Sequence, residues 1–159
     1  MKKINENGYS IVFVPIILGI LLLLISFIFE YGRYVTIKHQ LQSAADSAVL
    51  AGVSMCKVKY KDIEKIGEDE VVVEDKNTIV ELVADKAKSE ARTYLDKNLE
   101  ELNLNMVDIK EEDKKITIEN NTLQIELKAV IEGVFATALF DEDNGLAITV
   151  KAKAEPVDV

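Results

Sequence analysis

The chain has 159 residues and a formal net charge of −9, and it contains a single cysteine. This length allows one small domain, the acidic balance argues against nucleic-acid binding, and one cysteine excludes a disulfide within the chain. Lys2, Lys3 and Glu6 are the only charged side chains before Glu30, so the rest of the chain has a net charge of −10.

A hydrophobic segment, IVFVPIILGILLLLISFIF, occupies residues 11–29 and contains no charged side chain. A helix of about 20 apolar residues crosses a bilayer, and insertion of this segment is favourable by about 5–10 kcal/mol. A cleaved signal peptide is the alternative, but the segment is longer than a usual signal core and no small-x-small cleavage site follows it. We therefore expect an uncleaved anchor, with Pro15 near the first turn of its helix.

The flanking positive charges are nearly balanced, with Lys2 and Lys3 before the span and Arg33 and Lys38 after it. We expect a single-pass protein of the cell membrane with a cytoplasmic N-terminus and the acidic C-terminal part outside. The expected organisation is a cytoplasmic tail (1–10), a transmembrane helix (11–29), a helix extension (30–55) and an extracytoplasmic α+β domain (56–159).

The helical period continues beyond the span and predicts one helix to about Ser54. The residues that share its apolar seam are Tyr34, Ile37, Leu41, Ala44 or Ala45, Ala48 and Gly52. Its small-residue end can pack on the sheet of its own chain, which we expect, or admit another helix. Asp46 lies in this end, where it either reaches the domain or is an exposed helix residue.

A second amphipathic helix is predicted from Thr78 to about Glu101, because Thr78 and Glu81 fit a capping box. Its apolar stripe consists of Val80, Val83, Ala84, Ala87, Ala91, Tyr94, Leu95 and Leu102. The charged connection before it, residues 57–77, contains a candidate short strand at 71–73.

The period then falls to two, which predicts strands at 106–110 and 116–119 across the turn EEDKK, a turn at Asn120-Asn121, and strands within 123–129 and 146–154. Residues 133–140 fit either a short helix or a wide loop. Strands with one apolar face form an antiparallel sheet covered on one side. The predicted fold class is α+β: a long N-terminal transmembrane helix continues into a small extracytoplasmic domain of one or two helices packed on an antiparallel sheet.

The residues predict no catalytic, cofactor-binding or metal site. His39 is expected to be an exposed helix residue, and Cys56 a buried small side chain or, as a minor alternative, an intermolecular disulfide partner. The segment DEDNG (141–145) resembles the start of a calcium loop, but it lacks the third oxygen ligand and the later bidentate acid. A turn that uses Asn144-Gly145 explains it as well. We therefore expect a protein that is not an enzyme and has no cofactor.

The string GRYVTIKHQLQSAADSAVLAG (32–52) resembles the helix that follows the membrane span in TadE/TadG-like proteins of Flp (tight-adherence) pilus assembly. The matching residues are Gly32, Arg33, Leu41, Gln42, Ala44, Ala45, Asp46, Ala48, Ala51 and Gly52. The resemblance implies a non-enzymatic, membrane-anchored component of a Flp/Tad-type pilus assembly or secretion apparatus. Its implied partners are the membrane and other pilus-assembly or pseudopilin-like proteins.

Gly8 resembles the processing site of TadE-type members, in which a glycine is cleaved before an apolar segment with glutamate at its fifth residue. Here Phe13 stands at that fifth position, so the resemblance favours the unprocessed, TadG-like type. The alternative function is a membrane-anchored extracytoplasmic ligand-binding module or enzyme with no recognisable site.

Overall fold

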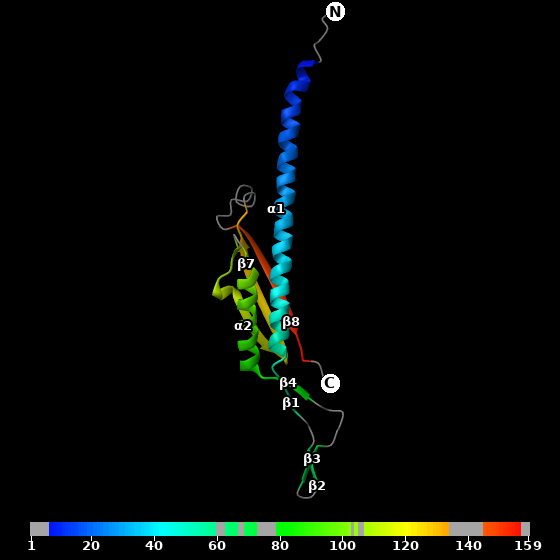
Figure 1. Cartoon of the computed structure of the whole chain (residues 1–159), viewed down its shortest axis with the longest axis vertical. Helices are drawn as coiled ribbons and strands as arrows, with labels where there is room; N and C mark the ends of the chain where they lie inside the picture. The colour runs from blue at the N-terminus through cyan, green and yellow to red at the C-terminus, as the bar shows by residue number, and fades with distance from the viewer. Residues whose placement is uncertain are drawn as a thin grey trace, which may run out of the picture.

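The computed structural model describes residues 7–59, 63–66, 69–72, 79–102, 104, 107–133 and 145–156 (Figure 1). A long helix precedes a small domain of one further helix and antiparallel strands, which confirms the predicted α+β class. The elements are α1 (Asn7–Val53), β1 (Cys56–Lys59), β2 (Ile63–Ile66), β3 (Asp69–Val72), β4 (Ile79–Leu82), α2 (Ala84–Leu102), β5 (Val107–Asp108), the short 3-10 helix η1 (Glu111–Asp113), β6 (Lys114–Glu119), β7 (Thr122–Ile131) and β8 (Leu146–Ala154).

Helix α1 is continuous over 47 residues and ends at Val53, as the periodicity predicted. The prediction for Pro15 was wrong, because the helix already begins at Asn7 and places Pro15 in its third turn. A proline at that position removes one internal backbone hydrogen bond, a loss that membrane helices tolerate.

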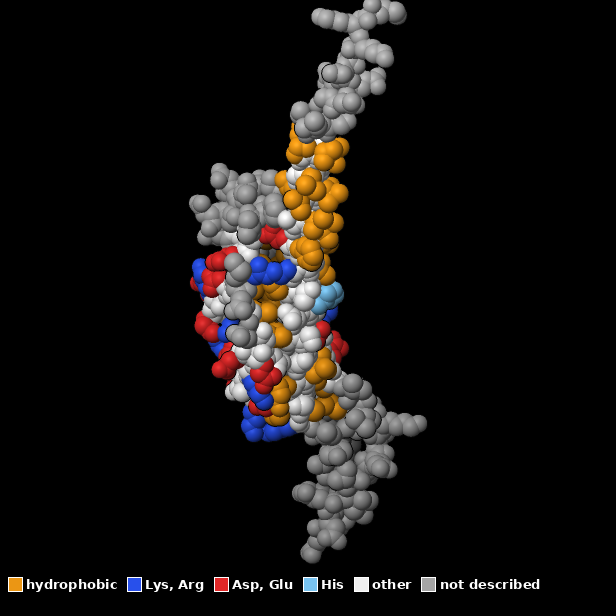
Figure 2. Space-filling view, turned by 45° about the horizontal axis from the view of Figure 1, so that its top comes forward, with side chains coloured by type: hydrophobic (Ala, Val, Ile, Leu, Met, Phe, Trp, Pro, Cys, Tyr) orange, Lys and Arg blue, Asp and Glu red, His pale blue; other side chains and the backbone are white. Residues whose placement is uncertain are grey.

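The large apolar side chains of the first half of α1 are exposed in the part that the structure describes. Residues from Phe13 to Phe29 are exposed on all sides of the helix, with Phe29 at 76% and Leu18 at 55%. Figure 2 shows orange side chains gathered along the upper part of the long helix. Among the described residues, α1 is the one helix long and apolar enough to cross a membrane. It fits a single-pass membrane anchor.

Strand β7 lies at the centre of the main sheet. It pairs with β8 along one side, and with β6 and β5 along the other, all antiparallel. The apolar residues predicted to share one face are buried: Leu123, Ile125, Leu127 and Ala129 on β7, and Ile148, Val150 and Ala152 on β8. Helices α1 and α2 cover this face, while the alternate, mostly polar residues point to the other side.

The turn predicted at Asn120-Asn121 joins β6 to β7. Both residues have positive φ, 49° and 63°, as a two-residue hairpin turn requires, and asparagine tolerates this backbone region well. The Asn121 side chain also holds strand β4: its Oδ1 accepts a bond from the Leu82 N–H (2.8 Å), and its Nδ2 donates to the Val80 carbonyl (2.7 Å).

The predicted start of the second helix at Thr78 was wrong. Residues 79–82 form β4, which pairs with β1, and α2 begins at Ala84. The β-branched residues Ile79 and Val80 favour a strand, and pairing on one side with Asn121 on the other satisfies its backbone. The helix end is as predicted, because α2 continues to Leu102, and Ala87, Ala91 and Leu95 of the apolar stripe are buried.

The two strands predicted around EEDKK exist but do not pair with each other. Both β5 and β6 pair with β7, and the first three residues of that motif form η1. The strand predicted at 71–73 corresponds to β3, which pairs with β2 in a separate hairpin beyond the β1–β4 ribbon (Figure 1). Residues 134–144, with most of the ambiguous 133–140 segment and of DEDNG, lie outside the described residues.

Candidate functional site

The second half of α1 is the element that joins the apolar segment to the domain. Its seam residues are buried from Ile37 onward, with Leu41, Ala45 and Ala48 at 0% exposure. They pack against α2, β7 and β8 in one core. The small-residue end of the seam therefore packs within its own chain, as expected.

Gly52 shows why this end of α1 needs small residues. A Cβ added at Gly52 would lie 2.3 Å from Leu123 Cδ2, 2.8 Å from the Ala87 carbonyl oxygen and 2.9 Å from Ala91 Cβ. Contacts this short are not available to a methyl group. The absence of a side chain at Gly52 lets α1 approach β7 and α2 at the same point.

Gln42 and Asp46 connect the helix to the sheet. Gln42 Nε2 donates to Asp46 Oδ1 (2.9 Å) on the next turn of α1 and to the Lys151 carbonyl oxygen (3.0 Å) on β8. The side chain of Asp46 does not reach the domain itself. It orients the Gln42 amide, which bonds a strand at the edge of the sheet, and this role was not anticipated for either residue.

Removing this amide should weaken the attachment of α1 to β8. Gln42→Ala is expected to cost about 0.5–1.5 kcal/mol in the free energy of unfolding, the usual net value of such hydrogen bonds. Asp46→Asn should cost less, because its amide oxygen can still accept from Gln42. Urea unfolding of the full chain in detergent measures both, and equal losses for the two variants would contradict the proposed geometry.

Three other residues of the predicted motif are not fully buried. Gly32 is exposed and a Cβ there would meet nothing within 4 Å, while Arg33 and Ala51 are half-buried. Gly8 is the second residue of α1. The sequence motif thus combines fully buried residues with residues that are exposed or half-buried.

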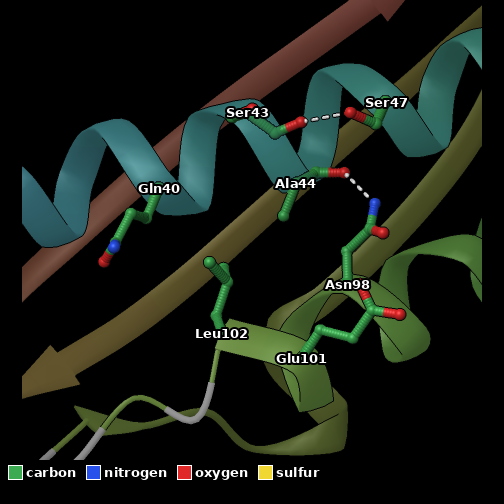
Figure 3. Close-up of a pocket in the computed structure, with 7 residues that line it drawn as sticks. All are labelled: Gln40, Ser43, Ala44, Ser47, Asn98, Glu101 and Leu102. Carbon is green, nitrogen blue, oxygen red and sulfur yellow. Dashed lines mark hydrogen bonds between the residues drawn. The ribbon is translucent and has the colours of Figure 1, made fainter.

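A shallow groove of about 400 Å³ separates α1 from α2 on one side of the interface. Figure 3 shows Gln40, Ser43, Ala44 and Ser47 along one wall and Asn98, Glu101 and Leu102 along the other. Ser47 donates its hydroxyl to the Ser43 carbonyl (2.8 Å), and Asn98 Nδ2 donates to the Ala44 carbonyl (3.5 Å). Glu101 is the one carboxylate among these lining residues, so the groove does not offer a paired acid and base.

The prediction for His39 was confirmed and the prediction for Cys56 was wrong. His39 is exposed on α1, as predicted. The prediction of a buried Cys56 was wrong, because the residue begins β1 at the edge of a two-stranded ribbon and is an exposed free thiol. Cys56 is the first residue of β1 and stands opposite Leu82 of β4, whose side chain packs against the core while the Cys56 thiol stays exposed.

A charged cluster that the sequence analysis missed connects α2 to the start of β6. Lys114 Nζ lies 2.7 Å from Asp96 Oδ1 and 2.6 Å from Glu111 Oε1, and Arg92 lies 2.6 Å from Glu111 Oε2. Hydrogen bonds from Lys114 and Arg92 hold the pKa of Glu111 below its ordinary value. Burial lowers the pKa of Lys114, but its bonds with Asp96 and Glu111 outweigh burial and leave that pKa raised.

The depressed pKa of Glu111 predicts a small acid sensitivity. Its contribution to stability is complete above its ordinary pKa of 4.5 and is lost as the pH falls through the lower pKa of the folded state. Glu111→Gln should therefore flatten the dependence of the urea midpoint on pH below that value. Glu112→Gln is the control, since Glu112 has no ion pair among the described residues. Equal slopes for both variants would contradict the assignment.

Within the described ranges, no group of three or more His, Cys, Asp or Glu side chains is arranged to hold a metal ion. Asp141 and Asp143, the acids of the calcium-like segment, lie outside those ranges. Gly145 follows them with φ of 81°, the positive value expected of a turn glycine. A Cβ at Gly145 would meet the Ile131 carbonyl oxygen at 2.3 Å.

Comparison with known protein families gives a match to the segment that contains nearly all of α1. Residues 8–55 match the family model described as putative Flp pilus-assembly TadE/G-like. The N-terminal segment of the chain is TadE/G-like. No curated protein and no solved structure matches the chain significantly. The TadE/G-like match begins one residue after the start of α1 and ends two residues after its last residue, Val53.

The TadE/G-like segment therefore coincides with one structural element that has two environments. Its first half is apolar and uncovered, and its second half forms the interface with α2 and the sheet. The family resemblance found in the sequence is confirmed for this segment, and the match does not distinguish the TadG-like from the TadE-like type.

Proposed function

We propose that the chain is a non-enzymatic, membrane-anchored component of a Flp/Tad-type pilus-assembly or secretion apparatus. The observation that supports this most strongly is the coincidence of the TadE/G-like match with α1. In this proposal, residues 11–29 cross the membrane, the N-terminus is cytoplasmic and the domain formed by residues 56–159 lies outside. The exposed apolar half of α1 would contact lipid or other span helices, and the domain would contact other assembly proteins.

In this proposal, the domain binds a partner and fixes the position of that partner relative to the membrane anchor. Helix α2 and the main sheet form a continuous core with α1, so a partner that contacts the domain is held at a fixed place relative to the anchor. The described part of the domain lacks buried unpaired polar side-chain atoms, the usual sign of an incomplete polar site.

Deletion of the gene in its own host tests this function. We expect loss or strong reduction of surface pili, counted by electron microscopy, and restoration by the wild-type chain. A chain with an arginine pair at Leu22 and Leu23 should not restore them, because charges at the centre of a span oppose insertion by about 2.5–3.5 kcal/mol each. Unchanged numbers and lengths of pili after deletion would refute the proposal.

The intact mass of the protein from its native membrane tests the proposed type. We expect the full-length mass, because Phe13 stands where processed members carry glutamate. Loss of residues 1–8 would instead assign the chain to the processed type and would leave the anchor in place.

A further inference from the structure

The hydrogen bond between Gln42 and β8 shows where the sheet lies along the axis of α1. Height below means the position along this axis. Gln42 Nε2 reaches the Lys151 carbonyl, so these two residues are level. From Lys151 back to Leu146 the strand rises about 17 Å at 3.4 Å per residue. From Gln42 back to Arg33 and Tyr31 the helix rises about 14 and 17 Å at 1.5 Å per residue. The end of β8 is therefore level with the turn of α1 that follows Phe29.

Two other elements end at the same height as Leu146. Ile131 of β7 pairs with Leu146 and also with Val107 of β5. We call residues 107–108, 131–133 and 145–146 the upper rim. Figure 1 agrees with this placement, since the upper ends of β7 and β8 lie alongside α1 rather than beyond its end.

The upper rim is held at this height rigidly. Helix α1 has no break between the apolar half and the docked half, and Thr36 Oγ1 bonds the Gly32 carbonyl (2.9 Å) across the turn at their junction. Below that turn, the seam is fixed by Leu41, Ala45 and Ala48, which are fully buried. The sheet and the apolar segment therefore move as one body.

We propose that the upper rim rests in the lipid headgroup layer, so that the domain sits directly on the membrane surface. This inference depends on the proposed membrane anchor. The headgroup region extends about 5–8 Å beyond the hydrocarbon core on each side. If Phe29 ends the span, Arg33 lies only about 6 Å beyond the hydrocarbon boundary, and the rim is level with it.

Attraction between the rim and charged lipids is not needed for this contact. The exposed side chains at or beside the rim have both signs, with Asp108 and Glu132 negative and Lys110 positive. The rigid helix alone brings them to the headgroups. The contact should therefore form on zwitterionic phosphatidylcholine and should change little when phosphatidylserine is added.

Fluorescence quenching in vesicles tests the proposal with the full chain. In a Cys56→Ser background, Glu132→Cys places a dye on the rim, and Glu155→Cys places it at the far end of the sheet. Glu155 bonds Thr122 (2.7 Å), and the sheet from Leu123 to Ile131 is about 27 Å long. In phosphatidylcholine vesicles with headgroup spin-labelled lipid, we expect several-fold stronger quenching at position 132 than at position 155.

A flexible insertion separates the role of the helix from that of the domain. A Gly-Ser-Gly-Ser insertion after Gly32 should reduce quenching at position 132 towards the value at 155. Equal weak quenching at both positions without the insertion would overturn the proposal. Extraction at alkaline pH checks the anchor separately: a chain that stays in the vesicles but lacks rim quenching refutes this inference alone, and a chain that is released refutes the anchor as well.

Discussion

Leu41→Ala is expected to lower the free energy of unfolding by about 2–5 kcal/mol, the range observed when a fully buried leucine is truncated. Leu41 is completely buried in the core that α1 shares with α2, β7 and β8. Its truncation removes apolar contacts and leaves a cavity at the interface between the helix and the sheet. Urea unfolding of the full chain in detergent, followed by circular dichroism, measures the loss.

Leu50→Ala is the matched control for this substitution. Leu50 lies on the same helix but is 65% exposed, so its truncation should change the free energy of unfolding by less than about 0.5 kcal/mol. Similar losses for both leucines would mean that α1 does not dock on the domain through the seam described here.

Gly52→Ala is the second large effect and is expected to destabilise the protein by about 1–3 kcal/mol through overpacking. The new methyl group would overlap Leu123, the Ala87 carbonyl and Ala91, and two of these neighbours belong to a helix that cannot easily move. The same unfolding measurement applies. A stabilised Gly52→Ala variant would show that α1 and α2 are not in contact at this point.

Gly32→Ala tests whether space, rather than the loss of glycine, causes that effect. Both glycines lie inside α1, but a Cβ at Gly32 meets nothing within 4 Å. Alanine favours a helix over glycine by about 1 kcal/mol, so Gly32→Ala should be neutral or slightly stabilising. Equal destabilisation by both substitutions would indicate a general effect on the helix.

Periodicity alone predicted the parts of the fold that have one buried face. The alternation along β7 and β8 and the seam of α1 each correspond to residues that are buried in the core. The Asn120-Asn121 turn was also predictable, because its backbone requirement is local. In each case, the physical cause acts within a few residues of the sequence.

The errors arose where distant residues decide the structure. The pattern at Thr78 and Glu81 fits a helix start, but β1 and the Asn121 side chain recruit the segment into β4 from 20 to 40 residues away. Likewise, the burial of a cysteine depends on whether a second layer covers its strand. The sequence around Cys56 contains no information about that layer.

The structural roles of the motif residues could not be predicted from the sequence. The resemblance selected Gln42, Asp46 and Gly52, yet their roles depend on Lys151 and Leu123, more than 70 residues further along the chain. No sequence pattern indicated the ion-pair cluster around Lys114. Its acids and bases look like ordinary solvated charges until α2 and η1 are placed side by side.

The ribbon of β1 and β4 holds the two ends of the 60–78 segment side by side, since Lys59 pairs with Ile79. The entropic cost of joining the two ends of a chain segment rises by only about 0.6 kcal/mol for each doubling of the segment's length. Residues 60–78 can therefore be lengthened, replaced by an epitope tag or exchanged for a foreign module at little cost to the core. Variation in this stretch would give the domain new contacts at the end opposite the apolar half of α1 without any change in its core.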